Sequence, residues 1–160
     1  YNIVPLYLVD EKAMEIDFAN HLFGMSRIGG VIGQIIIGFF LDRYSTRKII
    51  FLLVLGSGLS TLGIALVQTQ WLFTALLLLQ GTFSVVFFPV GIMAISQIAE
   101  VQERSVYTGT IMAVSQIVGI GATPFMLGAI ADIWSFQLGL VFLGCLTLCL
   151  SPIVIFLRKI

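Results

Sequence analysis

Charged side chains are scarce in this sequence. Of its 160 residues only 10% are Asp, Glu, Lys or Arg, whereas soluble domains average about 25%. Hydrophobic residues make up 59%, and the mean hydropathy is +1.09. So few charges cannot solvate the surface of a soluble protein of this size, and a small domain cannot bury all of its apolar surface. The composition therefore predicts a membrane protein whose apolar surface contacts lipid.

The chain also lacks the residue groups on which several protein classes depend. Its net charge is zero, with eight basic and eight acidic side chains and no basic stripe, so nucleic-acid binding is not expected. The only two cysteines, Cys145 and Cys149, lie in an apolar run without histidine or carboxylate neighbours, so packing is expected rather than a metal site. No nucleotide-binding loop or catalytic triad is found, and neither an enzyme nor a cofactor is predicted.

Long apolar runs fill most of the chain. A helix that crosses a bilayer needs about 20 apolar residues. Five segments have that length: residues 18–41, 49–67, 71–98, 106–133 and 136–157. Residues 1–9 are apolar over half a span, and no stretch alternates with the period of a strand. The sequence predicts one all-α transmembrane domain over residues 1–160, interpreted as the last five and a half spans of a longer protein.

The basic residues predict how the spans are oriented. The loop after the first complete span carries Arg43, Arg47 and Lys48, the loop after the third carries Arg104, and the tail carries Arg158 and Lys159. These are six of the eight basic residues, and all lie on one side. Lys and Arg accumulate in cytoplasmic loops. We expect a multi-pass protein of the cell membrane with a cytoplasmic C-terminus.

The first basic loop has a recognisable pattern. The stretch "GFFLDRYSTR" resembles the loop of the major facilitator superfamily that reads Gly-x-Leu-x-Asp-Arg-x-Gly-Arg-Arg/Lys. Four positions match: Gly38, Asp42, Arg43 and Arg47. Three depart from it: Phe40, Ser45 and Thr46. The departures favour the weaker second copy of the loop, between helices 8 and 9 of that fold.

The rest of the chain fits the same alignment. Arg104 followed by Gly109 resembles the start of helix 11, and the Gly/Pro-rich segment from Gly119 to Gly128 resembles the helix itself. The resemblance implies the C-terminal six-helix bundle of a twelve-helix transporter, helices 7 to 12 with helix 7 truncated. Its partners would be the missing N-terminal half, the lipid bilayer and a small-molecule substrate.

The resemblance also implies a role for Asp42. In the family, the aspartate of this loop caps a neighbouring helix and pairs with arginine in one transport state. Transferred here, Asp42 would bond at the start of the segment 106–133, near Arg104. A plain loop that only fixes topology is the alternative interpretation.

One charge lies inside a span. Arg27 is about nine residues into the first span, roughly 13 Å along a helix and near the bilayer midplane. Asn20 and Gln34 are spaced seven residues from it on the same face. No carboxylate of this chain lies equally deep, so Arg27 would meet a carboxylate of the missing half, backbone carbonyls or an anionic substrate.

Other polar residues at similar depth are substrate-binding candidates, with interhelical hydrogen bonds as the alternative for each. They are Tyr1, Asn2, Gln80, Ser84 and Gln116. The residues expected to kink or loosen helices are Pro89, Pro124, Gly119 and Gly121.

The predicted function is secondary active transport of a small organic solute by alternating access, as a symporter or antiporter. Unpaired Arg27 favours an organic anion. Proton coupling is common in the family, but its acid would have to lie in the missing half. Two alternatives remain open: a multidrug exporter, which the aromatic run Phe83, Phe87 and Phe88 favours, and a membrane sensor that binds without transporting.

Overall fold

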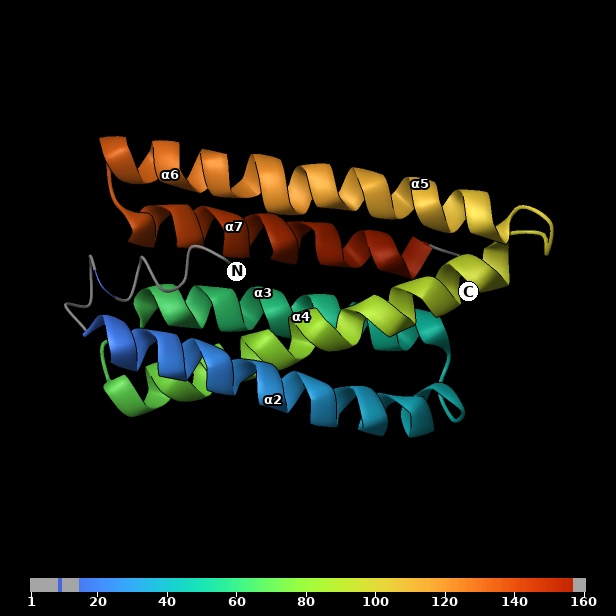
Figure 1. Ribbon diagram of the computed structural model, residues 1–160, viewed down its shortest axis with the longest axis horizontal. Helices are drawn as coiled ribbons and strands as arrows, with labels where there is room; N and C mark the ends of the chain where they lie inside the picture. The colour runs from blue at the N-terminus through green and yellow to red at the C-terminus, as the bar shows by residue number, and fades with distance from the viewer. Residues whose placement is uncertain (1–8, 10–14, 157–160) are drawn as a thin grey trace.

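The fold is an elongated bundle of helices running alternately in opposite directions (Figure 1). The computed structural model describes residue 9 and residues 15–156, apart from the side chains at 18, 19, 23, 26 and 27. The described elements are α2 (Ile16–Leu41), α3 (Thr46–Leu66), α4 (Gln70–Ile98), α5 (Arg104–Gln116), the π-helix η1 (Ile117–Ala122), α6 (Thr123–Ile133), α7 (Phe136–Leu150) and the 3-10 helix η2 (Ser151–Phe156).

Four described segments are long and apolar enough to cross a membrane. They are Thr46–Leu66, Gln70–Ile98, Arg104–Ile133 and Phe136–Phe156. The sequence predicted a fifth complete span at residues 18–41. There the structure has the 26-residue α2, whose described apolar part is the shorter stretch Ile28–Leu41. The side chains at positions 18, 19, 23, 26 and 27 lie outside the description, so a complete span at 18–41 stays a prediction.

Helix α3 begins at Thr46, three residues earlier than its apolar run predicted. Ser45 is extended (φ −63°, ψ 136°), as is usual for a helix N-cap. The amides of Lys48 and Ile49 then donate to the Ser45 carbonyl, at 3.0 and 3.3 Å. Arg47 and Lys48 therefore belong to the first turn of α3 rather than to the loop. Apolar runs mark the lipid-facing length of a helix, and polar residues can extend the helix beyond it.

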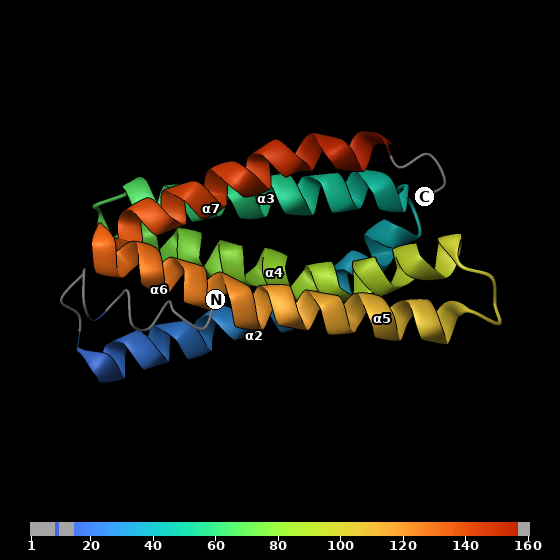
Figure 2. The same ribbon diagram turned by 90° about the horizontal axis from the view of Figure 1, so that it is seen from above.

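The core forms where α3 packs between α4 and α7, while α2 packs on α4. One cluster of buried residues joins α2, α3 and α4 near one end of the bundle: Leu22, Ile64, Phe73 and Leu77. A second joins α3 and α4 toward the other end: Ile49, Ile50, Leu53, Val86, Val90 and Ala94. Seen from above, α7 lies over α3 (Figure 2). Helices α3 and α4 are thus the centre of the described bundle.

Glycines allow two of these helix pairs to approach closely. A Cβ added at Gly30 of α2 would lie 2.6 Å from the Cβ of Val85 on α4. A Cβ added at Gly144 of α7 would lie 2.7 Å from Cγ of Leu62 on α3 and 3.1 Å from its backbone nitrogen. Small residues at such contacts are typical of helix packing in membranes.

Helices α5 and α6, with η1 between them, form one rod at the edge of the bundle (Figure 1). The rod contacts α7 through α6 and α4 through α5. Neither α5 nor η1 has a buried residue, and α6 has only Leu127. This rod is therefore the least enclosed part of the described structure.

The segment around Pro124 remains helical but changes its hydrogen-bond pattern. Gly119 and Gly121 lie in the π-helix η1, and Pro124 lies in the first turn of α6. The amide of Thr123 donates to the Val118 carbonyl five residues back, and Thr123 Oγ1 donates to the same oxygen at 2.8 Å. Proline has no amide hydrogen to donate, so a π-helical turn beside Pro124 disturbs fewer backbone hydrogen bonds than it would beside another residue. Bending at this segment, and at Pro89 within the continuous α4, stays a prediction.

Candidate functional site

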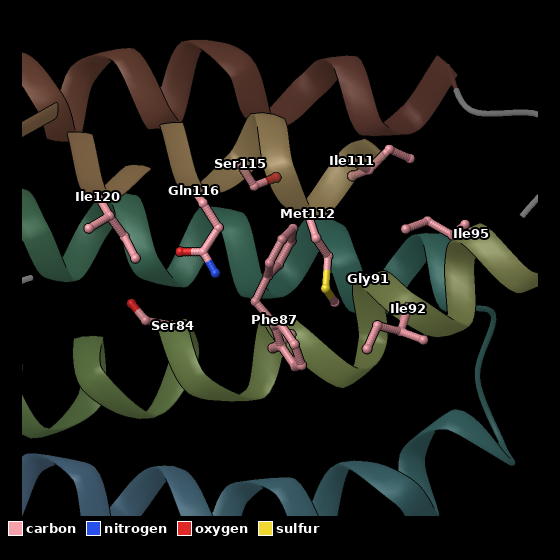
Figure 3. A pocket seen from close by; sticks show the side chains of 11 residues that line it. Ser84, Phe87, Gly91, Ile92, Ile95, Ile111, Met112, Ser115, Gln116 and Ile120 are labelled. Atoms are coloured by element: carbon pink, nitrogen blue, oxygen red, sulfur yellow. The ribbon is translucent and has the colours of Figure 1, made fainter. Parts of the chain in front are cut away.

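A cavity of about 300 Å³ lies between α4 and the α5–η1 segment. Its α4 side is one helical face: Ser84, Phe87, Phe88, Gly91, Ile92 and Ile95. Its other side comprises Ile111, Met112, Ser115, Gln116 and Ile120. Figure 3 shows these side chains approaching one another from the two helices. The cavity brings together two predicted site residues, Ser84 and Gln116, which are 32 positions apart in the sequence.

The lining is apolar except for three uncharged polar side chains. Ser84, Ser115 and Gln116 are exposed, and none has a hydrogen-bond partner among the described residues. The amide of Gln116 points toward α4, on the side where Ser84 lies (Figure 3). Apolar walls with a few convergent polar groups are typical of small-molecule sites. The cavity can hold an apolar body and hydrogen-bond a polar group on it.

A second cavity of about 300 Å³ adjoins the first. It is lined by Leu53, Val54, Ser57, Phe83, Ser84, Phe87 and Thr147, from α3, α4 and α7. Ser84 and Phe87 line both cavities. A rotamer change at Phe87 would therefore alter both spaces at once.

Gln80 lies one turn before Ser84 on α4 and lines neither cavity. Its Oε1 is buried and has no hydrogen-bond partner in the described structure. An unpaired buried acceptor is unfavourable by about 1–3 kcal/mol. Gln80 is thus a polar group whose presence packing does not explain.

Gln34 lies against α4 rather than in the cavity. Its Nε2 donates to the backbone carbonyl of Val85, at 3.2 Å. In an uninterrupted helix that carbonyl would accept the amide hydrogen of residue 89, but residue 89 is proline. The sequence grouped Gln34 with possible substrate contacts, and the structure gives it an interhelical hydrogen bond.

The other candidates on the first part of the chain lie away from this cavity or outside the description. Asn20 lines a separate surface depression with Asp17, His21, Gly24 and Met25. Arg27 lies within α2, but its side chain is outside the described part. Tyr1 and Asn2 are outside the described residues. Their roles stay predictions.

The residues of the family loop lie at one end of the bundle. Asp42 and Arg43 are exposed, and their side chains form no hydrogen bond or ion pair with the described residues. Arg47 Nη1 donates to the Ile155 carbonyl of η2 at 3.5 Å, a long contact. Arg104, the first residue of α5, donates through Nε to the Ala99 carbonyl at 3.3 Å. The predicted bond between Asp42 and the start of α5 is not formed in this structure.

Cys145 and Cys149 differ from expectation, because both thiols are exposed on α7 rather than packed. Two cysteines four positions apart share one helix face, and here that face points off the described bundle. Over residues 9 and 15–156, no three His, Cys, Asp or Glu side chains gather closely enough to hold a metal ion.

Sequence reasoning missed most of the apolar cavity lining, including Ile92, Ile95, Ile111 and Met112. Their signal is weak, because these residue types are common throughout the chain. Helical spacing from Ser84 and Gln116 would have found them: positions 88, 91, 92 and 95 follow Ser84, and 112 precedes Gln116 by one turn.

The fold and cavity fit the result of sequence comparison. The profile of the Major Facilitator Superfamily matches residues 1–160, the whole chain. A comparison with curated proteins finds no match. Proteins of this superfamily are membrane transporters and not enzymes. The chain belongs to the major facilitator superfamily, as a multi-pass membrane transporter.

Proposed function

We propose that the chain is the C-terminal half of a twelve-helix transporter. Helices α2, α3 and α4 would be helices 8, 9 and 10, the α5–α6 rod helix 11, and α7 with η2 helix 12. The family loop supports this assignment, because it lies between α2 and α3 and matches the weaker second copy of the pattern. The α5 helix also begins at Arg104, as helix 11 would.

We further propose that the end of the bundle carrying this loop is cytoplasmic. The α2–α3 and α4–α5 connections lie at the same end, on the right in Figure 1. These connections and the first turns of α3 and α5 that follow them carry Arg43, Arg47, Lys48 and Arg104. An excess of Lys and Arg in short loops sets the cytoplasmic side.

The proposed activity is secondary transport of a small organic solute by alternating access. The observation that carries it is the α4–α5 cavity. The cavity lies beside the least enclosed rod of the bundle, and its three polar side chains have no hydrogen-bond partner in the described part of the chain. In transporters built from two halves, the substrate binds between them near the midplane. The cavity fits a solute with an apolar body and at least one hydrogen-bonding group.

The charge of the solute depends on Arg27. None of the eleven residues lining the cavity is charged, so an organic anion would have to be recognised by Arg27 from α2. If Arg27 instead pairs with an acid of the other half, the aromatic lining supports the second candidate, a multidrug exporter. Any proton-carrying acid would also belong to that other half.

The test is uptake by the full-length protein in liposomes, with pairs of solutes that differ only as carboxylate and amide. An anion carrier takes up the carboxylate faster, and Arg27→Gln removes that preference. A multidrug exporter treats both members of a pair alike, with or without Arg27→Gln. Binding without uptake of any solute would reject transport and leave the membrane sensor.

The cavity itself is tested by Gln116→Leu. Loss of one hydrogen bond should weaken solute binding about threefold to tenfold. Gln97→Leu, an exposed position on α4 outside the cavity, is the matched control and should bind as the wild type does. Equal binding by both variants would place the solute elsewhere.

We also propose that Asp42 bonds at the start of α5 in another transport state. Such a bond would stabilise one of two conformations, as a gate requires. Asp42→Ala should change the maleimide reactivity of a cysteine placed in the cavity, whereas Glu103→Ala, an exposed carboxylate at the same end, should not. Unchanged reactivity and unchanged transport in Asp42→Ala would leave the loop with a role in topology alone.

A further inference from the structure

Pro89 interrupts the hydrogen-bond ladder of α4 without ending the helix. Helix α4 runs from Gln70 to Ile98 with Pro89 inside it. Since proline has no amide hydrogen, the carbonyl of residue 85 loses its intrahelical partner. In a membrane an unpaired backbone carbonyl is strongly unfavourable, and a neighbouring helix can pair it again.

The carbonyl left by Pro89 is the one that Gln34 contacts. Gln34 Nε2 of α2 lies 3.2 Å from the Val85 oxygen. This reach requires the two helices to be close. Within the turn before Gln34, Gly30 and Gly33 face Val85 and Val86, and a Cβ added at either glycine would lie under 3.0 Å from those side chains. The glycines allow the two helices to approach closely, and this brings Gln34 Nε2 within hydrogen-bond distance of the Val85 oxygen.

We propose that Gln34 replaces the missing amide donor of residue 89 and thereby fixes the geometry of α4 at Pro89. Gln34 is then a positioning residue and not a ligand of the transported solute. This assigns a role to a polar residue of α2 that the structure places against another helix's backbone. The capping itself does not depend on what the protein carries.

The hydrogen bond from Gln34 lies beside the part of α4 that lines the cavity. Ser84, Phe87 and Phe88 line the cavity before Pro89, and Gly91, Ile92 and Ile95 line it after Pro89. The backbone turn between residues 85 and 89 therefore sets how the two parts of this wall lie relative to each other. Gln34 acts on the wall through α4 without lining the cavity. This consequence for transport rests on the proposed function.

The capping is tested by a double-mutant cycle in the full-length protein in lipid nanodiscs. Gln34→Met keeps the length of the side chain and removes its donor. Pro89→Ala restores the amide at residue 89. If Gln34 caps Val85, Gln34→Met lowers the melting temperature by about 2 °C in the wild type, and causes no loss in the Pro89→Ala protein, where Val85 has an intrahelical partner again.

The matched control is Gln137→Met. Gln137 Nε2 donates to the Ala65 carbonyl at 2.9 Å, an interhelical bond of the same kind, and the residue four positions after Ala65 is Thr69 rather than proline. Its loss of melting temperature should be the same in both backgrounds. An equal loss from Gln34→Met in both backgrounds would overturn the capping.

A second measurement separates positioning from general stability. Maleimide reactivity is compared for two cysteine variants in a protein whose Cys145 and Cys149 are replaced by serine. Ile95→Cys lies in the cavity wall after Pro89, and Leu79→Cys is an exposed α4 position outside both cavities. Gln34→Met should change the rate at position 95 about threefold, the shift that a typical interhelical hydrogen bond supports. Position 79 should not change, and Pro89→Ala should abolish the effect.

Equal changes at both positions, or none at either, would overturn the positioning role. The result also separates this inference from the proposed function. Thermal coupling between Gln34 and Pro89 in a protein that takes up no solute would keep the capping and reject transport. Loss of uptake in Gln34→Met without that coupling would reject the capping.

Discussion

Replacing Gly30 by alanine should weaken the contact between α2 and α4. The added Cβ would lie 2.6 Å from the Cβ of Val85 and 2.8 and 2.9 Å from its two methyl carbons. Favourable carbon–carbon contacts begin at about 3.5 Å. A rotamer change of Val85 moves its methyl groups but not its Cβ, so the helices themselves must separate.

The size of the effect follows from two opposing terms. Overpacking of this kind is unfavourable by about 1–3 kcal/mol. Alanine is favoured over glycine inside a helix by about 1 kcal/mol. The net loss should be about 0–2 kcal/mol; its central value of about 1 kcal/mol corresponds to about 2–4 °C in melting temperature for a chain of this size. Separation of the helices should also lengthen the bond from Gln34 to the Val85 carbonyl.

The assay is thermal unfolding of the purified protein in detergent. Gly24→Ala is the control, because it lies on the same helix and a Cβ there would have no neighbour within 4 Å. That variant should gain the helix-propensity term and melt about 2–4 °C higher. A Gly30→Ala protein as stable as Gly24→Ala would refute the close packing of α2 on α4.

Two further predictions concern the centre of the bundle. Gly144→Ala should lower the melting temperature by about 2–4 °C, because its Cβ would lie 3.1 Å from the backbone nitrogen of Leu62. The control is Gly128→Ala, where a Cβ would have no neighbour within 4 Å. Equal melting temperatures of the two variants would contradict the α3–α7 contact. Gln80→Met should raise the melting temperature by about 2 °C or more, since it removes a buried oxygen that has no partner. A fall in melting temperature would mean that Gln80 Oε1 is paired in the full-length protein, and a fall in uptake with a rise in stability would make it a solute contact.

The sequence singled out some of the residues that line the cavity and missed others for a physical reason. Ser84 and Gln116 stood out because polar residues are rare in spans this apolar. The residues around them, such as Ile95 and Met112, did not stand out, because the same types also face lipid and core. Only the pairing of α4 with α5 shows which isoleucines line a cavity.

Gln34 shows what helical spacing leaves open. Helical spacing placed it on one face with Asn20 and Arg27, and that shared face predicted a shared role. Spacing gives the direction of a side chain around its own helix but not the neighbour it meets. The structure brings Gln34 to the Val85 carbonyl, whereas Asn20 lies on a surface depression near the start of the helix.

The sequence by itself determined the class of protein, the approximate extent of its helices and, through the loop from Gly38 to Arg47, its family. These properties follow from local quantities, namely apolar run length, charge placement and a short motif. Tertiary structure alone decided that α4 and α5 enclose a cavity and that Gln34 pairs the carbonyl left by Pro89. Both depend on contacts between residues tens of positions apart, which are set by how glycines and bulky side chains allow the helices to pack.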